Sequence, residues 1–275
     1  MKTKKLPITI AILTKNEEMV IEDAILSVKK HFNEIVVLDS FSIDNTIELV
    51  KKHKITFYKK KFYDYASQRN YVLNKIKIKN RWVFFLDADE VVSNSLISEI
   101  KNNITKLNNE KIGLVYFRRK DYFLNKWIKR SSGYPTWFGR LCRVGNVEIK
   151  RKINEEYTTN LEFLKFDSHI LHYPFKKGIA KWVEKHNYYS TMEAELQSNK
   201  SKIDLKNFKI NDPNQKRAYI KNIFVRLPLK PLLMFLYLYF FRLGFLDGIP
   251  GLYFAFLKSF YEFMIILKIR EFHNK

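Results

Sequence analysis

Short apolar runs alternate with helical patterns over the first hundred residues, and this alternation limits the possible folds more than any other feature of the sequence. Four runs are typical of strands buried in a sheet: residues 8–13, 34–38, 55–58 and 82–86. After the first run, Ile21, Ala24, Ile25 and Val28 follow the i, i+3, i+4, i+7 spacing of a helix with one buried face. Strands that alternate with helices form right-handed βαβ units, so we expect an α/β fold around a parallel sheet.

Acidic residues follow two of these predicted strands. Asp39 ends the second run, and Asp87 and Asp89 follow the fourth. Ligands of open α/β sheets bind at the carboxyl ends of the strands. On an extended segment, side chains at i and i+2 point the same way, and carboxylates suit Mg²⁺ or Mn²⁺. An Asp-x-Asp also occurs in turns, where aspartates only bond the backbone, but its position after a buried strand favours a metal–diphosphate site.

Glycine usage narrows the nucleotide chemistry. The first glycine is Gly113, so the first strand-to-helix turn, residues 14–17, cannot form a glycine-rich phosphate loop. This excludes the dinucleotide-binding fingerprint and the phosphate-loop pattern at the positions where those folds need them. A divalent metal held by carboxylates is the remaining way to neutralise a diphosphate. We therefore expect an enzyme that uses a nucleotide-linked donor.

Charge and cysteine content describe the surroundings of the protein. The formal charge of +22, with 16% aromatic residues, suits a polyanionic partner, either nucleic acid or an anionic membrane. The single cysteine, Cys142, excludes an intramolecular disulfide, favours a reducing compartment, and is expected to be a small buried side chain. The apolar run after the basic N-terminus is too short for a signal peptide core.

Beyond Gly113 the pattern changes. Strands are predicted at 113–118, 140–144 and 169–173, followed by a helix over 177–198 and a polar linker over 200–214. On the predicted helix, Ile179, Trp182, Val183 and His186 share one face. We expect two domains: a nucleotide-binding catalytic domain over residues 1–175, and a helical region over 176–275.

The C-terminal tail carries two uncharged apolar runs, residues 231–241 and 249–257, interrupted by Arg242, Gly244, Asp247 and Gly248. Each run is shorter than the roughly twenty residues needed to span a bilayer. The tail could be two helices packed on the protein's own core, or an amphipathic hairpin that lies in a membrane interface. The density of Phe and Leu favours the membrane-associating hairpin.

Several motifs occur together in a fixed order: Thr14-x-Asn16-Glu17, Val37-Leu38-Asp39-Ser40-x-Ser42-x-Asp44-x-Thr46, Gln68-Arg69-Asn70 and Leu86-Asp87-Ala88-Asp89-Glu90. This set resembles the family 2 glycosyltransferases of the GT-A fold, which implies a Rossmann-like, mixed but mostly parallel sheet flanked by helices. Later motifs resemble the bacterial lipopolysaccharide-core β-1,4-glucosyltransferase branch: Tyr134-Pro135, Arg140-Leu141-x-Arg143, Asn154-Glu155, Ile170-Leu171-His172-Tyr173 and Arg242-x-Gly244-Phe245-x-Asp247-Gly248.

The resemblance implies a donor site and a metal site. The residues implied to contact the nucleotide donor are Thr14, Asn16, Glu17, Asp39, Arg69, Asp87 and Asp89. Asp89 is implied to bind Mg²⁺ or Mn²⁺ directly, Asp87 to contact ribose or metal, and His172 to complete the metal or diphosphate contacts. Helix capping is the alternative role for Glu17 and Asp39, and a solvated side chain is the alternative for Arg69.

The resemblance also implies a general base and an acceptor site. The family's base is the glutamate of a His-Glu pair, and here Asn154 stands in place of the histidine. We expect Glu155 to be the base, with Glu156 as the alternative, because inverting transfer needs one carboxylate to take the acceptor hydroxyl's proton. Arg140 and Arg143 are expected to contact a phosphorylated acceptor, or else to pair with acids on the surface.

The function implied is that of a metal-dependent inverting glycosyltransferase at the inner face of the cytoplasmic membrane. It would move a sugar, expected to be glucose, from a UDP-sugar to a lipid-linked glycan in lipopolysaccharide or cell-envelope biosynthesis. One alternative is transfer to polyprenyl phosphate. The other is a non-enzymatic protein that binds nucleic acid or membrane, although Lys and Arg are spread along the chain and no nucleic-acid motif is recognised.

Overall fold

A computed structural model describes residues 5–151, 155–198 and 229–273 of the chain. The chain divides into two compact units. The first unit contains Met1–Lys120 and Pro135–Lys177, and the second contains Asp121–Tyr134 and Gly178–Lys275. The segment Asp121–Tyr134 therefore groups with the C-terminal residues. The linker predicted over 200–214 lies outside the described residues.

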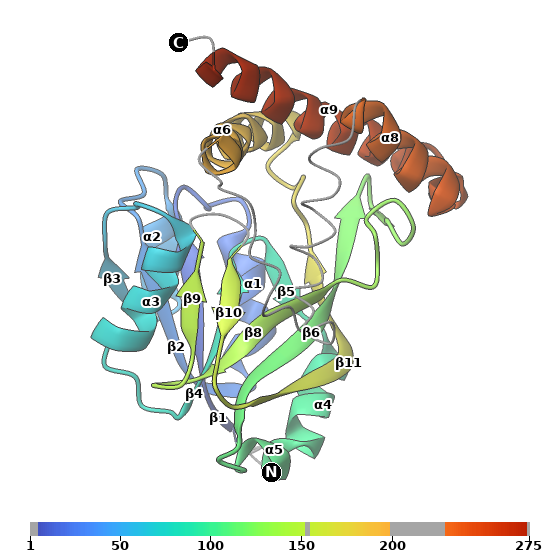
Figure 1. Ribbon diagram of the computed structural model, residues 1–275. Coiled ribbons are helices and arrows are strands. Elements are labelled where there is room, and N and C mark those ends of the chain that lie inside the picture. The colour runs from blue at the N-terminus through green and yellow to red at the C-terminus, as the bar shows by residue number, and fades with distance from the viewer. Residues whose placement is uncertain (1–4, 152–154, 199–228, 274–275) are drawn as a thin grey trace. The chain divides into compact units, whose positions relative to one another are not determined.

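The main sheet has the strand order β3-β2-β1-β4-β8-β6-β11-β5, with β7 paired to β6 (Figure 1). Its strands are β1 (Leu6–Thr14), β2 (Phe32–Asp39), β3 (Thr56–Lys59), β4 (Trp82–Asp87), β5 (Glu90–Val92), β6 (Ile112–Phe123), β7 (Lys126–Trp127), β8 (Trp137–Arg143) and β11 (Glu162–His172). A separate hairpin joins β9 (Glu148–Lys150) to β10 (Glu156–Thr158). The four strands β3, β2, β1 and β4 run parallel, whereas β8 is antiparallel to both β4 and β6. The predicted α/β fold with a mixed sheet is confirmed.

Strand register brings the carboxyl ends of β1, β2 and β4 together. Thr14 lies opposite Asp39, and Leu13 lies opposite Asp87. We call this side of the sheet the carboxyl edge. It is the edge at which ligands bind in open α/β sheets.

Helices cover both faces of this sheet, which explains the continuous apolar runs. The helices of the first unit are α1 (Ile21–Lys29), α2 (Thr46–Lys52), α3 (Tyr65–Lys75), α4 (Asn94–Asn102) and α5 (Ile104–Leu107). On β1, Ile10 and Ile12 belong to one buried cluster, and the intervening Ala11 belongs to the other. The predicted stripe on α1 is confirmed, because Ile21, Ala24, Ile25 and Val28 are its buried residues.

Aspartate side chains stabilise the starts of two helices. Asp64 caps α3 by accepting the Ser67 N–H at 2.6 Å. At the start of α2, Asn45 occupies the N-cap position, and Asp44 accepts the N–H of Thr46 at 3.0 Å. Asp44 therefore stabilises the first turn of α2 from one residue further out.

Besides residues 121–134, the described part of the second unit is helical. Its helices are α6 (Ile179–Ser198), α8 (Lys230–Leu236), the π-helical turn η2 (Tyr237–Phe241), the 3₁₀ turn η3 (Gly244–Asp247) and α9 (Gly248–His273). Both α6 and α8 pack against α9. The Asp247 carboxylate accepts the backbone N–H groups of Lys129, Arg130 and Ser131 at 2.8–3.2 Å. These bonds hold residues 129–131 to the C-terminal helices.

The face of α6 that Ile179, Trp182, Val183 and His186 share is buried only in part. Trp182 is buried, but Ile179 and Val183 are exposed, and the other buried positions include Met192 and Ala194. The packing against α9 selects this face, so the local pattern of apolar residues did not determine it.

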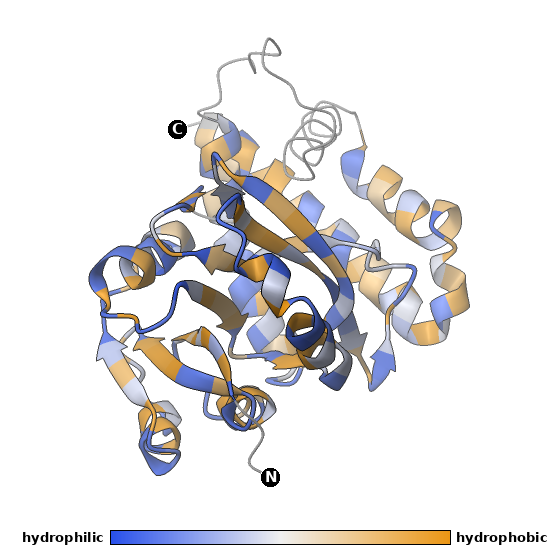
Figure 2. Cartoon of the chain, turned by 90° about the horizontal axis from the view of Figure 1, so that it is seen from below, coloured by the Kyte–Doolittle hydropathy of each residue, from blue (hydrophilic) through white to orange (hydrophobic). Residues whose placement is uncertain are grey.

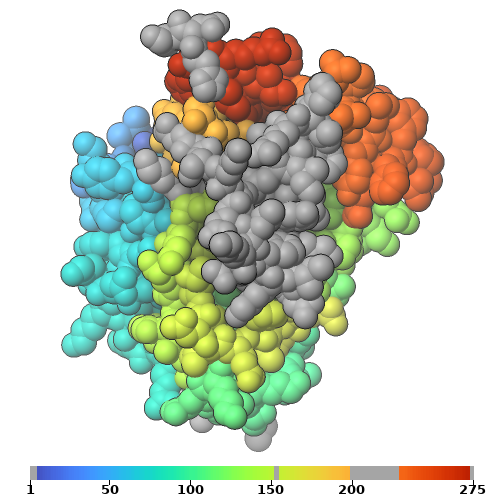
Figure 3. Space-filling model, viewed as in Figure 1, coloured from blue at the N-terminus to red at the C-terminus, as the bar shows by residue number. Residues whose placement is uncertain are grey.

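Many apolar side chains of α8 and α9 lie at the surface. Figure 2 shows by colour that both helices are rich in hydrophobic residues, and Figure 3 shows atoms of both at the surface in orange and red. In the described residues, no single helix is long and apolar enough to cross a bilayer. The segments 230–241 and 244–272, which are bent by 70° relative to each other, pass that test only as a pair.

Candidate active site

Two arginines join three carboxylates at the carboxyl edge. Arg69, on α3, donates from Nη2 to Asp87 Oδ1 at 2.8 Å and from Nε to Glu155 Oε1 at 3.1 Å. Arg140, on β8, donates from Nη2 to Asp87 Oδ2 at 2.6 Å and to Glu90 Oε1 at 2.8 Å. We call these five residues the arginine–carboxylate network.

Arg69, Arg140 and Glu90 are buried, whereas Asp87 and Glu155 are partly exposed, and the charges of the network shift the pKa of Asp87 and of Glu90. Arg69 is 2% exposed and Glu90 is fully buried. Burial works to raise the pKa of Asp87, but Arg140 and Arg69 outweigh it and hold the pKa of that carboxyl well below its usual range. Burial raises the pKa of Glu90, against the opposing charge of Arg140. Because buried ions are costly unless they are paired, these contacts keep Asp87 ionised and fix its orientation.

Asp89, two residues after Asp87, lies beside His172. The Asp89 Oδ2 atom is 3.5 Å from His172 Nε2. The Tyr173 N–H also donates to the Asp89 carbonyl at 2.9 Å. His172 reaches this position because β11 pairs antiparallel with β5, which places His172 opposite Glu90.

The structure therefore separates the two aspartates. Residues 88 and 89 form a turn between β4 and β5, so the expectation that Asp87 and Asp89 point the same way from an extended strand does not apply. Both oxygens of Asp87 accept from arginines, whereas Asp89 lies with His172. A role for Asp87 as a metal ligand stays a prediction.

The Asp89–His172 pair fits a divalent ion of the kind that binds a diphosphate. Among residues 5–151, 155–198 and 229–273, no group of three or more His, Cys, Asp and Glu side chains could hold a metal. Mg²⁺ typically binds through one or two protein ligands and completes its shell with substrate phosphates and water. Asp89 and His172 would supply one oxygen and one nitrogen ligand, and a donor and water would supply the others.

The motifs after β1 and β2 bond to each other. Thr14 donates its hydroxyl to Asp39 Oδ1 at 3.0 Å, and Ser42 donates both its N–H and its hydroxyl to Asp39. The Asn16 amide oxygen accepts the Ile43 N–H at 2.9 Å. These bonds bring Thr14, Asn16 and Asp39 together at the carboxyl edge. Their contacts with a donor stay predictions.

Glu17 is tied to the end of the first unit. Its carboxylate lies 2.8 Å from Lys177 Nζ, and Lys177 also donates to the Asn16 carbonyl at 3.2 Å. The sequence held no signal for Lys177, because it comes from a segment 160 residues further along the chain. Glu90 was visible in the Asp87–Glu90 run, but nothing local indicated its pairing with Arg140.

Of the two candidate bases, only Glu155 belongs to the network. Glu156 begins β10, and its carboxylate lies 3.2 Å from Arg151 Nη1. Asn154 lies outside the described residues. The geometry thus places Glu155 with Asp87 and gives Glu156 a separate partner.

Arg140 and Arg143 both bond to other groups of the protein, and their expected contacts with an acceptor stay predictions. Arg140 pairs with Asp87 and Glu90. Arg143 is buried and donates to the carbonyls of Leu107, Asn109 and Ile112 at 2.6–3.0 Å. The antiparallel register sets Arg143 opposite Trp82, at the start of β4, which is the edge away from Asp87.

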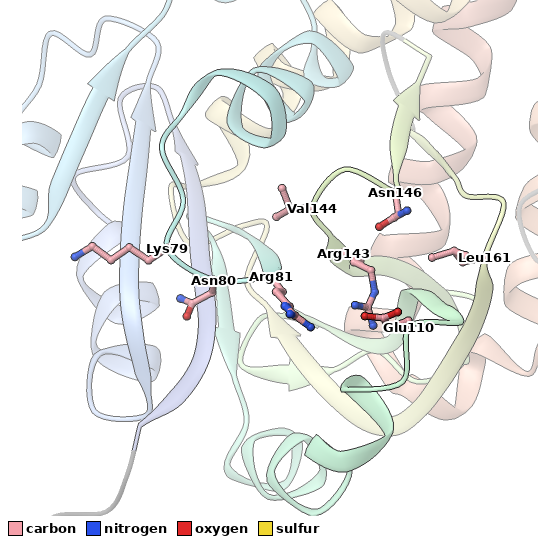
Figure 4. A pocket seen from close by; sticks show the side chains of 8 residues that line it. All are labelled: Lys79, Asn80, Arg81, Glu110, Arg143, Val144, Asn146 and Leu161. Atoms are coloured by element: carbon pink, nitrogen blue, oxygen red, sulfur yellow. The ribbon is translucent and has the colours of Figure 1, made fainter.

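A surface hollow of about 580 Å³ lies at that opposite edge (Figure 4). It is lined by Lys79, Asn80, Arg81, Glu110, Arg143, Val144, Asn146 and Leu161. Glu110 is its only carboxylate, and none of the predicted donor or metal residues reaches it. The predicted donor and metal residues therefore lie away from this hollow.

We expect Arg143→Met to lower stability without altering acceptor use. The change removes three hydrogen bonds from a charged donor, each worth about 1.5–3 kcal/mol. The Leu107 carbonyl still accepts from Trp82 Nε1, and the Asn109 carbonyl still accepts from the Ile112 N–H. Thermal unfolding should show a lower Tm than for Arg81→Met, which changes an exposed arginine at the same hollow. A raised acceptor KM with an unchanged Tm would instead support the acceptor role.

Comparison with known proteins identifies the family. The family model described as glycosyl transferase family 2 matches residues 9–174, which is more than half of the chain. The chain belongs to glycosyl transferase family 2.

Individual relatives match over different lengths. An uncharacterized glycosyltransferase of Rickettsia conorii is 26% identical over 278 residues, which cover 94% of this chain and 88% of that protein. The SPbeta prophage-derived glycosyltransferase SunS of Bacillus subtilis is 31% identical over 163 residues, which cover 57% of this chain and 36% of SunS. The chain thus matches about a third of the length of SunS.

Two solved structures illustrate the range of structural similarity. TarS of S. aureus, residues 1–349, has a TM-score of 0.44 and 13% identity over 98% of this chain and 92% of that structure. Glucosyl-3-phosphoglycerate synthase of Mycobacterium tuberculosis, in complex with Mn²⁺, UDP and glucosyl-3-phosphoglycerate, has a TM-score of 0.35 and 21% identity, covering 41% and 44% of the two chains.

Proposed function

We propose that this protein is a metal-dependent inverting glycosyltransferase that moves a hexose, expected to be glucose, from a UDP-sugar to a lipid-linked glycan of the cell envelope. The lipopolysaccharide-core branch suggested by the sequence motifs is the pathway we favour. The observation that carries the proposal is the placement of Asp89 with His172, and of Glu155 with Asp87 and Arg69, on the carboxyl edge of one sheet.

The donor half of the site is supported by charge. When bound, the divalent ion at Asp89 and His172 would stabilise the negative charge of the departing diphosphate. Arg69 has one further donor, Nη1, which is buried and without a hydrogen-bond partner in the described part of the chain. An anionic donor would satisfy it, in keeping with the expected contact between Arg69 and the nucleotide.

The transfer step needs one proton acceptor. As the acceptor hydroxyl oxygen forms its bond to the anomeric carbon, the bond from that carbon to the diphosphate oxygen breaks, and Glu155 takes the hydroxyl proton. UDP leaves with the electron pair of the broken bond. This single displacement inverts the anomeric centre and requires no covalent intermediate.

The lipid-linked acceptor and the membrane location are supported by the second unit. Most of the exposed large apolar side chains in the described residues lie between Leu229 and Leu267. On α9, the exposed residues Ile249, Tyr253, Phe256 and Phe260 recur at intervals of three and four residues along one side of the helix. An exposed apolar stripe of this length is typical of a helix in a membrane interface.

The donor proposal predicts metal-dependent binding and turnover. A UDP-sugar at a hundred times its Kd, with Mn²⁺, should raise Tm by roughly 5–10 °C, since such binding contributes about 2.7 kcal/mol. Hydrolysis of the UDP-sugar should stop with a chelator and return when Mn²⁺ is added. Screening UDP-, GDP- and CMP-sugars in parallel identifies the donor, and turnover that persists in chelator would contradict the proposal.

A further inference from the structure

The loop after β2 is held in one shape by its own polar groups. The Asp39 carboxylate accepts the N–H and the hydroxyl of Ser42, at 2.9 and 2.5 Å. The Ile43 N–H bonds to Asn16, and Asp44 accepts the N–H groups of Glu18 and Thr46 at 3.1 and 3.0 Å. With these bonds made, the loop presents its side chains in a defined direction.

The apolar side chains of this loop nevertheless face solvent. Ile43 is 91% exposed and Phe41 is 54% exposed, so neither contributes much to the core. Phe41 also has a φ of 60°, in the left-handed region that a bulky residue rarely adopts. Backbone strain of this kind costs about 1–3 kcal/mol and persists only where the surrounding structure enforces it. The loop is thus built to keep two apolar side chains outside the fold.

Lysines at the end of β3 lie near aromatic side chains of this region. Lys59 Nζ lies 5.9 Å from the centroid of the Phe41 ring, and Lys60 Nζ lies 5.2 Å from that of Tyr63, which is 67% exposed. The Lys60 N–H donates to the Asp39 carbonyl at 3.0 Å, which holds the two strand ends together. We name the group formed by Phe41, Ile43, Lys59, Lys60, Lys61 and Tyr63 the basic–apolar patch.

We propose that the basic–apolar patch is a membrane-docking surface that inserts Phe41, Ile43 and Tyr63 into an anionic phospholipid interface. Apolar and aromatic tips enter the boundary between headgroups and acyl chains, while lysines keep their charge at the phosphates. The three consecutive lysines and the formal charge of +22 complement an anionic leaflet. The patch belongs to the first unit, so it is a contact separate from the apolar stripe on α9.

Docking through this patch has a consequence for catalysis. The patch follows the carboxyl ends of β2 and β3, and Asp87 ends β4 on the same edge of the parallel sheet. Binding there would turn the catalytic edge toward the lipid surface. This part of the inference rests on the proposed function, because it assumes that the acceptor is lipid-linked.

Insertion of the patch into a membrane can be measured with a fluorophore attached at position 43. Ile43→Cys introduces one reactive thiol, because the native Cys142 is fully buried and burial raises the pKa of its thiol. An environment-sensitive fluorophore at position 43 should shift to shorter wavelength with vesicles that contain phosphatidylglycerol, and not with phosphatidylcholine vesicles. The matched control is Phe163→Cys, an exposed aromatic at the start of β11, away from the carboxyl edge. Phe41→Cys provides a second position within the patch.

The lysines should determine the affinity that this label reports. Replacing Lys59 and Lys60 together with Gln should weaken the vesicle-induced shift about thirtyfold, since each basic residue near an anionic surface contributes about 1 kcal/mol. Vesicle sedimentation without a shift at positions 43 and 41 would overturn the proposal and leave the α9 stripe as the membrane contact. An equal shift with neutral vesicles, or a shift with UDP-sugar alone, would also overturn it.

The result is independent of catalysis. The labelled Ile43→Cys protein can carry Asp89→Ala, which removes the candidate metal ligand and leaves the patch intact. A shift in this variant, combined with no sugar transfer by the wild-type protein, would reject the proposed function and retain the docking surface.

Discussion

Asp89→Ala is expected to lower kcat by about a hundredfold to a thousandfold. A divalent ion that stabilises the charge of the leaving group lowers the activation free energy by several kcal/mol, and each 1.36 kcal/mol changes the rate about tenfold. Asp89 lies in the turn after β4, with its carboxylate 3.5 Å from His172 Nε2, and its carbonyl is already fixed by the Tyr173 N–H. The measurement is the initial rate of UDP-sugar turnover over a range of Mn²⁺ concentrations.

The control for this change is Asp23 on α1. Asp23 and Asp89 both line a small surface crevice, and the Asp23 carboxylate pairs with Lys176. Asp23→Ala should leave turnover near the wild-type rate. His172→Gln should have a turnover rate between those of these two variants. The rate should recover in part at higher Mn²⁺ concentration, since the substitution removes one proposed metal ligand and leaves the other. Full activity in Asp89→Ala would reject the metal assignment.

The features that could be predicted from sequence are those that local patterns specify. A strand buried on both faces must be apolar along its whole length, so the limits of β1 and β4 followed from runs such as Trp82–Leu86. The residue that ends such a run is placed at a sheet edge, which is why Asp39 and Asp87 were recognisable. The buried stripe of α1 followed from its helical period in the same way.

The partners of these residues could not be predicted, because strand pairing between distant segments determines them. Arg140 reaches Asp87 only because β8 inserts antiparallel beside β4, with Leu141 opposite Phe84. The same register carries Arg143 to the opposite edge, where it bonds to backbone carbonyls. Two arginines three residues apart, which looked equivalent in sequence, therefore have different roles.

Packing also decided which arginine each of the two candidate bases contacts. Glu155 and Glu156 are adjacent in sequence, and the family resemblance favoured Glu155 as the base, with Glu156 as the alternative. The structure places their carboxylates on different arginines, Arg69 and Arg151. Only Arg69 also contacts Asp87, so the tertiary structure separates the two glutamates.

This difference gives the second large expected effect. Glu155→Gln should lower kcat about a hundredfold to ten-thousandfold, the range for loss of a general base, with little change in the affinity for UDP and Mn²⁺. Glutamine retains a carbonyl oxygen that can accept from Arg69 Nε, so the network keeps its geometry while the proton acceptor is lost. The measurement is kcat for transfer beside the Kd for UDP.

Glu156→Gln is the matched control, because it makes the same chemical change one residue away and disturbs only the contact with Arg151. A large loss in Glu156→Gln with a near-normal rate in Glu155→Gln would transfer the role of base to Glu156. If both variants lose kcat and UDP affinity together, the pair acts in donor binding, and the proton acceptor lies elsewhere. A loss of kcat confined to Glu155→Gln would mean that Arg69 holds Asp87 and the base in one rigid arrangement, so positioning of the base would depend on the same guanidinium that keeps Asp87 ionised.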